Sequence, residues 1–115
     1  MAGGLSVHAV DLTRGRPAEG LAVVLADANG SPIVAGRILA TGFPDCAEVM
    51  ARPLPAGQYR LLLRVAEYFV ARGDPLPTVP FLEDARFDFW NRDPAFHIHL
   101  PFKFSPWGYS MFRGN

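Results

Sequence analysis

The chain ends with FHIHLPFKFSPWGYSMFRGN, residues 96–115, and the first half of this stretch alternates between large apolar side chains and mostly polar ones. Successive side chains of an extended strand point to opposite faces. One face therefore carries an apolar set, Phe96, Ile98, Leu100, Phe102 and Phe104. The other face carries His97, His99, Pro101, Lys103 and Ser105. We predict a strand with one face in the core and the other against something polar.

Short apolar alternations separated by glycine and proline fill most of the remaining chain, a pattern typical of an antiparallel β-sandwich. Further strands are predicted at residues 5–12, 21–27, 33–42, 58–65, 81–91 and 109–115. Asn29-Gly30 indicates a tight hairpin turn, because glycine tolerates the positive φ that such turns require. Residues 66–73 have helical spacing and end at Gly73, which predicts one short helix. The proline-containing residues 43–57 are predicted to be a connection.

Composition limits the class of protein. With 115 residues, half of them hydrophobic, the chain is the size of one domain, 1–115. Eleven basic and eleven acidic residues cancel without any Lys/Arg cluster, which argues against nucleic acid or an anionic membrane as a partner. No leader and no spanning segment of about 20 apolar residues is visible, so we expect a soluble cytoplasmic protein. The lone Cys46 excludes an intramolecular disulfide.

All three histidines, His8, His97 and His99, fall on the polar faces of predicted strands. His97 and His99 share a face and could hold zinc, but no further ligand is evident except Cys46, at an unknown distance. We favour a metal-free acid/base pair, because imidazole titrates near neutral pH and can activate a water molecule. A surface or hydrogen-bonded structural role is the more common fate of a histidine on a strand.

Two further residues have both a functional and an ordinary interpretation. Arg113 would offer a fork of donors to a carbonyl or anionic substrate, whereas the alternative is a solvated tail. An aromatic-rich terminus in a last strand indicates that the chain end is held in place. Cys46 is more often a small buried hydrophobe than a nucleophile.

LSVHAVDLTRGRPAEGLAVVL at residues 5–25 and HIHLPFKFSPWGYSMFRGN at residues 97–115 resemble the two ends of the transthyretin-related 5-hydroxyisourate hydrolases. The resemblance implies a transthyretin-like sandwich of two four-stranded sheets with one short helix. It implies dimers that pair into a homotetramer, with a channel at the dimer–dimer interface. It also implies hydrolysis of 5-hydroxyisourate, the product of urate oxidation in purine breakdown, with no metal or organic cofactor.

Residue by residue, the resemblance implies catalytic roles for His8, His99 and Arg113. It implies substrate contacts by residues around them: His97, Cys46, Phe112, Gly114 and Asn115. The sequence departs from the family pattern at three of these positions. Cys46 aligns with a substrate-polarising arginine, Phe112 replaces a tyrosine and Asn115 replaces a serine. A fixed cation is therefore lost unless Arg37 or Arg52 replaces it.

The leading hypothesis is a cofactor-free hydrolase that opens a cyclic amide or imide ring with water activated by His8 and His99. The substrate would be 5-hydroxyisourate or, because of the altered positions, another cyclic metabolite of a biosynthetic pathway. Cys46 would be a covalent nucleophile if it lined the channel. The alternatives are a non-catalytic small-molecule-binding protein like transthyretin and an inactive paralogue that assembles with an authentic hydrolase.

Overall fold

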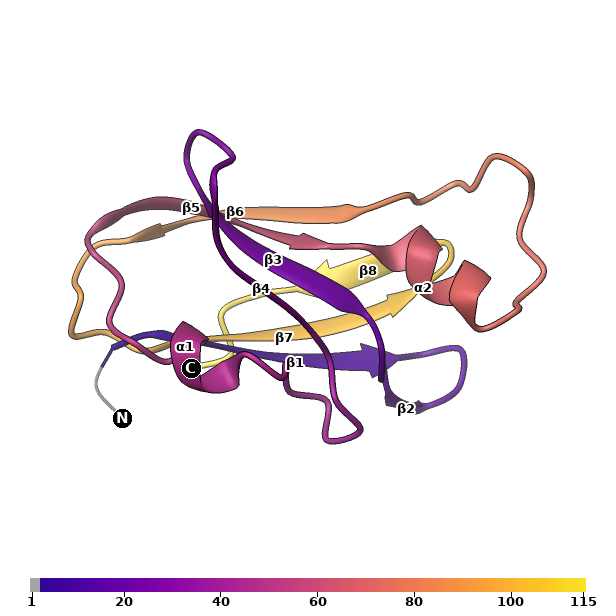
Figure 1. The fold of residues 1–115 in the computed structure, drawn as a ribbon, viewed down its shortest axis with the longest axis horizontal. Helices are drawn as coiled ribbons and strands as arrows, with labels where there is room; N and C mark the ends of the chain where they lie inside the picture. The colour runs from indigo at the N-terminus through magenta and orange to yellow at the C-terminus, as the bar shows by residue number, and fades with distance from the viewer. Residues whose placement is uncertain (1–2) are drawn as a thin grey trace.

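The structure is a computed structural model that describes residues 3–115, so residues 1–2 of the predicted domain 1–115 lie outside the described residues. Two four-stranded sheets pack face to face, as predicted (Figure 1). The first sheet has the order β2-β1-β7-β8, formed by Arg16–Pro17, Leu5–Asp11, Ile98–Ser105 and Gly108–Met111. The second has the order β4-β3-β5-β6, formed by Pro32–Arg37, Ala22–Asp27, Gly57–Leu63 and Ala85–Asn91.

One strand pair departs from the expected antiparallel arrangement. β1 and β7 run parallel, in a register that extends from Leu5 opposite Ile98 to Asp11 opposite Phe104. The other ladders of the described residues are antiparallel. The parallel pair places the first long strand directly beside the last one, so the two ends of the sequence form one continuous surface.

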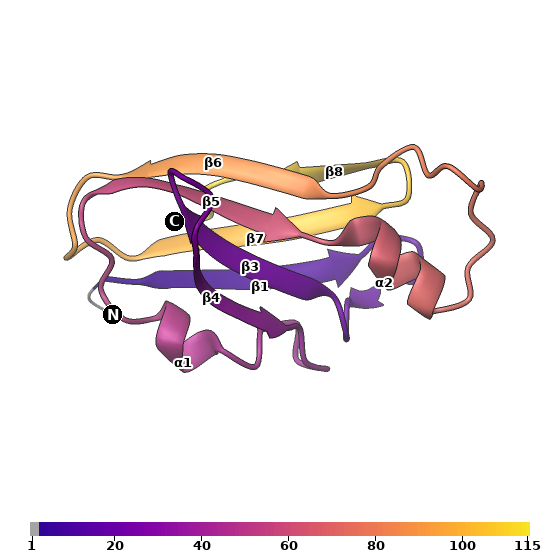
Figure 2. The ribbon, with the colours of Figure 1, turned by 45° about the horizontal axis from the view of Figure 1, so that its top comes forward.

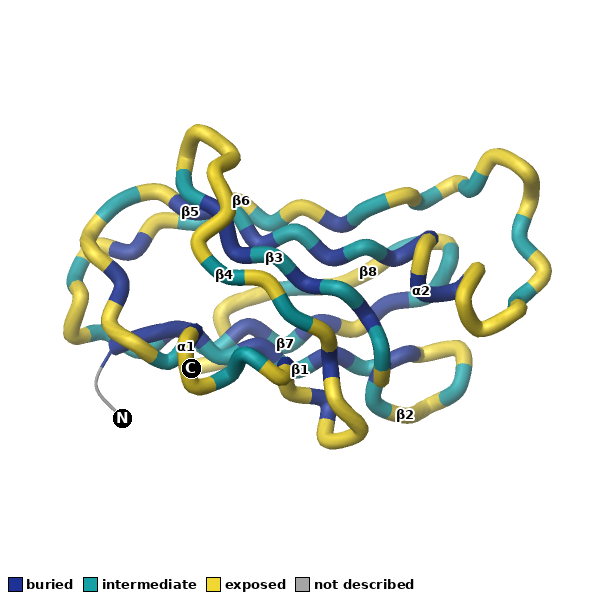
Figure 3. The backbone as a smooth tube through the Cα atoms, in the orientation of Figure 1, coloured by how far each residue is buried: buried dark blue, intermediate teal, exposed yellow. Residues whose placement is uncertain are grey.

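The core lies between the sheets and is built by strict alternation. Leu5, Val7 and Ala9 of β1 are fully buried, while the residues between them are half-buried. The same alternation runs along β7, where Ile98, Leu100, Phe102 and Phe104 are buried (Figure 3). The prediction of a core face and an opposite polar face is confirmed within both strands. Phe96, which was also predicted on the core face, instead precedes β7 and is only half-buried.

The described structure contains two short helices, whereas the sequence analysis predicted one. The predicted helix is present as α2 (Val65–Ala71), and α1 (Ala47–Met50) lies within the predicted connection. Four residues are too few to give a recognisable helical period, and Pro44 and Pro53 confine α1 to about one turn. The two helices lie at opposite ends of the long axis of the sandwich (Figures 1 and 2).

Three strands are shorter than predicted. β4 ends at Arg37, and residues 38–44 instead form a loop in which Leu39 N–H donates to Phe43 O. β6 begins only at Ala85, after an exposed stretch. β8 ends at Met111, and residues 112–115 continue along β7 as a tail. Among the described residues, no helix is long and apolar enough to cross a membrane.

A buried carboxylate connects the two layers at the end of β1. Asp11 is fully buried and accepts hydrogen bonds from Arg14 Nη1 at 2.9 Å, Tyr68 O–H at 2.8 Å and Thr13 N–H at 2.8 Å. Burial alone would raise the pKa of Asp11, but these donors outweigh it and hold the pKa below its ordinary value. Burial and the bond to Asp11 raise the pKa of Tyr68 to about 12.

We expect Tyr68→Phe to lower the free energy of unfolding at pH 7 by about 1–3 kcal/mol, because a buried carboxylate loses one donor. The Asp11 contribution is complete above the unfolded aspartate pKa and is lost as pH falls through the lowered folded pKa, so the difference should shrink in acid. Urea denaturation measures both effects. Tyr109→Phe, at an exposed side chain, is the control, and equal stability of the Tyr68→Phe and wild-type proteins would contradict the prediction.

Candidate active site

A serine lies between two histidines on the outer face of the first sheet. The β1–β7 register places Ser6 directly opposite His99. Ser6 Oγ lies 2.7 Å from His99 Nδ1 and 2.9 Å from His97 Nε2. The remaining ring nitrogen of His97, Nδ1, lies 2.9 Å from the backbone oxygen of Gly3. These four groups form one hydrogen-bonded relay: Gly3 O, His97, Ser6 and His99.

When both imidazole rings are neutral, the direction of each bond in this relay follows from the Gly3 carbonyl; a doubly protonated His97 would donate to Ser6 instead. A backbone carbonyl only accepts, so His97 Nδ1 carries the proton and donates to Gly3 O. Neutral His97 then presents a lone pair at Nε2, to which the Ser6 hydroxyl donates. Ser6 Oγ in turn accepts from His99 Nδ1–H. The proton of His99 is therefore on Nδ1, and its Nε2 is an unprotonated base.

His8 lies on the same face of the first sheet and is oriented by a different segment. Its Nε2 lies 3.2 Å from Thr41 O, so Nε2–H donates and the Nδ1 lone pair of the neutral ring is free. The Phe43 ring packs edge-on at a centroid distance of 4.8 Å. Gly42 has a φ of +90°, and a Cβ there would collide with the His8 imidazole. Loop 39–44 thus holds His8 through close packing that only glycine permits.

His8 and His99, the two histidines with predicted catalytic roles, lie close enough in the sheet to act on one molecule. His8 is opposite Pro101, two positions along β7 from His99. This diagonal step on one face of the sheet separates the Cα atoms of His8 and His99 by roughly 8 Å.

The C-terminal tail is fixed against this site by the side chain of its last residue. Gly114 N–H donates to His99 O at 2.7 Å. The Asn115 amide oxygen accepts from His99 N–H at 3.1 Å, and its Nδ2–H donates to His97 O at 2.9 Å. The Asn115 amide thereby takes the place of a backbone peptide group beside β7. Both halves of this amide are engaged with β7, so the amide holds the tail.

The tail carries Arg113 to the site. Arg113 Nε–H makes a long bond of 3.4 Å to Asn115 Oδ1, and its side chain is otherwise without a partner in the described part of the chain. Phe112 is half exposed. Gly114 has no space for a side chain, because a Cβ there would lie 2.8 Å from Pro101 Cγ and 3.1 Å from His99 Cδ2. The close approach of the tail to His99 thus requires glycine.

Cys46 lies apart from the relay, at the N-terminus of α1. A Cβ on Gly36 of β4 would lie 2.7 Å from its Sγ, so the thiol packs against the edge of the second sheet. Burial, with a contribution from Asp45, raises the pKa of the Cys46 thiol. The described structure gives it no contact with His8 or His99. A neutral, half-buried thiol is a poor nucleophile.

Neither arginine considered as a replacement cation contacts the histidines in the described structure. The Arg37 guanidinium donates to Gly20 O at 3.0 Å and to Glu67 at 3.2 Å, which directs it toward α2. Arg52 is exposed just beyond α1. The tail that carries Arg113 is instead bonded to His99 through Gly114, the residue that follows Arg113 in the chain.

A cavity of about 200 Å³ lies between β1 and the segment that contains α1. Ser6 and His97 line one side of it, and Phe43, Pro44 and Ala47 line the other. Its surface is almost entirely apolar. The Ser6–His97 half of the relay therefore lies beside an apolar wall.

The shared zinc ion considered for His97 and His99 lacks a complete ligand set. Within residues 3–115, no group of three or more histidine, cysteine, aspartate or glutamate side chains has the spacing of a metal site. Each of the two histidines instead uses one ring nitrogen to bind Ser6.

Sequence reasoning missed Ser6 and the loop that holds His8. Ser6 shares a face of β1 with His8, but its two hydrogen-bond partners lie 91 and 93 residues away in the sequence. A hydroxyl two positions before a strand histidine was the available signal. The bond from His8 to Thr41 O involves a backbone group, for which side-chain patterns carry no information.

Known proteins resemble this chain in sequence and in fold. The model of the HIUase/Transthyretin family matches residues 5–114. A 5-hydroxyisourate hydrolase of Deinococcus radiodurans is 35% identical over 97% of this chain and 96% of that protein. The solved structure of 5-hydroxyisourate hydrolase from Klebsiella pneumoniae has a TM-score of 0.80 and 32% identity, over 98% of this chain and 94% of that one.

Sea bream transthyretin, solved with thyroxine, has a TM-score of 0.77 and 28% identity over 95% of this chain and 92% of that one. The same sandwich is therefore found in proteins named for hydrolysis and in one solved with a bound hormone. The family match extends over almost the whole sequence, and the relatives are covered nearly end to end. The chain belongs to the HIUase/transthyretin family.

Proposed function

We propose that this protein is a cofactor-free hydrolase that opens a cyclic amide ring, with 5-hydroxyisourate as the first substrate to test. The observation that carries the proposal is the hydrogen-bonded relay from Gly3 O through His97 and Ser6 to His99, which would orient a neutral His99 with its lone pair on Nε2. Relatives named 5-hydroxyisourate hydrolase that align over nearly the whole chain support the same reaction class.

In the first step, His99 Nε2 takes a proton from a water molecule while the water oxygen forms a bond to the ring carbonyl carbon. The lone pair of His8 Nδ1 accepts a hydrogen bond from the water or from a ring N–H, which orients the reactants. The His99 imidazolium that forms is stabilised through Ser6, since Nδ1–H already donates to the hydroxyl.

The carbonyl oxygen gains negative charge in this step, and the unpaired donors of Arg113 are suited to stabilise it. In the second step the tetrahedral intermediate collapses and the ring C–N bond breaks. His99 returns its proton to the leaving nitrogen, so that one water is consumed and a carboxyl group and an N–H group are formed.

The substrate range depends on a cation that this chain lacks. Cys46 aligns with an arginine of the family pattern, and the thiol lies against Gly36. Losing a charged donor removes about 1.5–3 kcal/mol of hydrogen bonding to the substrate. A cyclic amide or imide with fewer polar groups than 5-hydroxyisourate is therefore the second substrate class to test.

A non-catalytic ligand-binding function is the alternative, favoured by the thyroxine-bound neighbour of the same fold. The retained relay argues against it, because a carrier has no need of an unprotonated histidine held in one tautomer. In either case we propose a single domain that assembles as a homotetramer in the cytoplasm. The apolar residues on and near β8, such as Trp107 and Phe112, would be covered in such an assembly.

Replacing the base is the first test. We expect His99→Ala to lower kcat/KM for freshly generated 5-hydroxyisourate by about 100-fold or more, the usual contribution of a general base. Rapid mixing followed by ultraviolet absorbance measures this. Lys103→Ala, at an exposed position of the same strand, is the matched control. An unchanged kcat/KM in His99→Ala would contradict the role of His99 as the base, and a wild-type rate no faster than the uncatalysed reaction would favour the binding function.

Removing the centre of the relay tests how His99 is oriented. We expect Ser6→Ala to lower kcat at least about tenfold with little change in KM, because His99 is no longer held in the Nδ1–H tautomer. Ser6→Thr retains the hydroxyl and should restore most of kcat. Loss of activity in both variants would instead indicate a packing role for Ser6.

Cys46 offers a third test, for which a pair of variants is informative. We expect Cys46→Ala to retain the wild-type kcat, since its raised pKa keeps the thiol neutral. Abolished turnover in Cys46→Ala would instead support covalent catalysis. If the substrate of this protein has changed and 5-hydroxyisourate is now a poor one, Cys46→Arg should hydrolyse 5-hydroxyisourate faster than the wild type does.

A further inference from the structure

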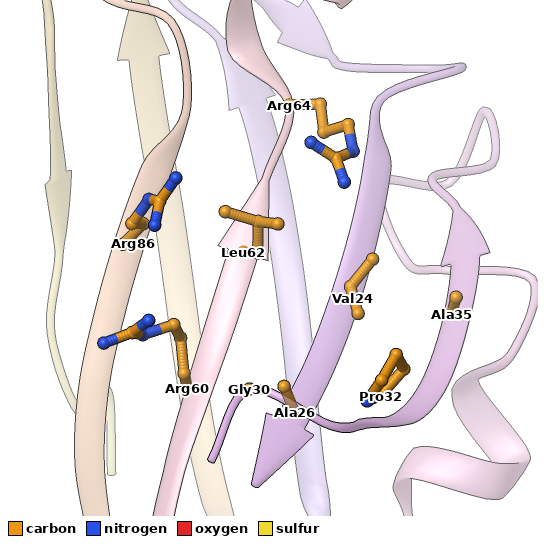
Figure 4. Close-up of a pocket in the computed structure, with 9 residues that line it drawn as sticks. All are labelled: Val24, Ala26, Gly30, Pro32, Ala35, Arg60, Leu62, Arg64 and Arg86. Carbon is orange, nitrogen blue, oxygen red and sulfur yellow. The ribbon is translucent and has the colours of Figure 1, made fainter. Parts of the chain in front are cut away.

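The second sheet carries a groove on its outer face, on the side of the sandwich away from the first sheet and its relay. Its volume is about 390 Å³, within the usual range for small-molecule sites. Val24, Ala26, Ala35 and Leu62 form an apolar floor across three strands, and Arg60, Arg64 and Arg86 form the rim. We call this set of residues the arginine groove (Figure 4).

Strand register explains why the arginines converge. Arg60 and Arg64 lie on β5 and just after it, separated by Leu62, so all three side chains point to one face. Leu62 is directly opposite both Val24 of β3 and Arg86 of β6. Figure 4 shows Arg60 and Arg86 on the β6 side of Leu62, while Arg64 reaches toward β3.

The carboxylates beside the groove do not balance its charge. Asp88 pairs with Arg60, at 2.7 Å from Nε and 3.2 Å from Nη2. Asp84 makes a single contact of 3.4 Å with Arg64. Arg86 has no ion pair within the described residues, although its charge helps Arg60 to hold the pKa of Asp88 below the ordinary value. Three guanidinium groups against two carboxylates leave one net positive charge.

The apolar floor of the arginine groove sets a second requirement for a ligand, in addition to negative charge. Ala26, Ala35 and Val24 are small, so they leave a shallow apolar surface between the arginine side chains. An antiparallel sheet with one solvated face usually carries polar residues there. A flat apolar body would cover this surface, while a negative group at its edge would meet the guanidinium of Arg86.

We propose that the arginine groove binds a small organic monoanion with a flat apolar body, the chemistry of an aromatic carboxylate. One net positive charge matches one negative charge, and planar guanidinium groups bind carboxylates through two parallel hydrogen bonds. This site is separate from the proposed hydrolysis. In a tetramer whose channel is lined by the first sheet, the groove remains open to solvent.

Isothermal titration with 2-naphthoate tests the proposal on the full chain. The expected result is one site per chain, with an affinity that falls about tenfold or more in Arg86→Gln, since a charge-assisted bond is lost. Arg16→Gln, at an exposed arginine of β2 outside the groove, should bind like the wild type. Arg86→Gln should retain wild-type thermal stability and, if the protein is a hydrolase, its turnover rate.

Two control ligands and one control variant separate the groove from other sites. Neutral 2-naphthylmethanol and inorganic phosphate should each bind much more weakly, because one lacks the charge and the other the apolar body. His99→Ala should bind 2-naphthoate normally. Absence of binding, equal affinity in Arg86→Gln and Arg16→Gln, equal binding of either control ligand, or loss in His99→Ala alone would each overturn the proposal.

Discussion

The parallel pairing of β1 with β7 is the constraint on which the candidate active site depends. It places Ser6 opposite His99 and His8 opposite Pro101, although these residues come from opposite ends of the sequence. A slip of one residue would turn Ser6 and His8 into the core, so the register must be fixed firmly. The buried Leu5, Val7 and Ala9 oppose such a slip, because it would move their apolar side chains to the polar face. Core packing therefore determines the geometry of the polar face.

Local patterns in the sequence were sufficient for much of the fold. Alternation in residues 96–105 predicted which side of β7 is buried, and helical spacing located α2. The parallel partner of β7 could not be deduced in this way, because pairing between distant strands leaves no periodic signal. The one-turn helix α1 was missed since its four residues are shorter than any usable window.

The candidate site was predicted only in part, for a related reason. His8, His97 and His99 were identified because each lies on the polar face of a predicted strand. The structure brings His97 and His99 together through Ser6. The role of Asn115 emerged only from its backbone partners on β7. Its amide reproduces the two hydrogen bonds of a neighbouring strand, whereas a terminal serine has too short a side chain to do both. This departure from the family pattern therefore strengthens the attachment of the tail beside His99.

Cys46, which the resemblance aligns with an arginine, would weaken the site rather than strengthen it. Nothing in its described surroundings replaces the positive charge of an arginine. The histidines and Arg113 would have to stabilise a developing negative charge with one cation fewer. An Arg113 side chain left with free donors is consistent with that greater demand. Under the proposed function, His99 would remain the base while the lower charge of the site would allow a different substrate preference.

Long-range ¹H–¹⁵N spectra of the imidazole rings at neutral pH report directly which nitrogen of each histidine carries the proton. We expect His97 and His99 both to carry their proton on Nδ1 and His8 to carry it on Nε2. That pattern would establish His99 Nε2 as the available base. A His99 ring protonated on Nε2 would contradict the account, because the relay through Ser6 would then run in the opposite direction.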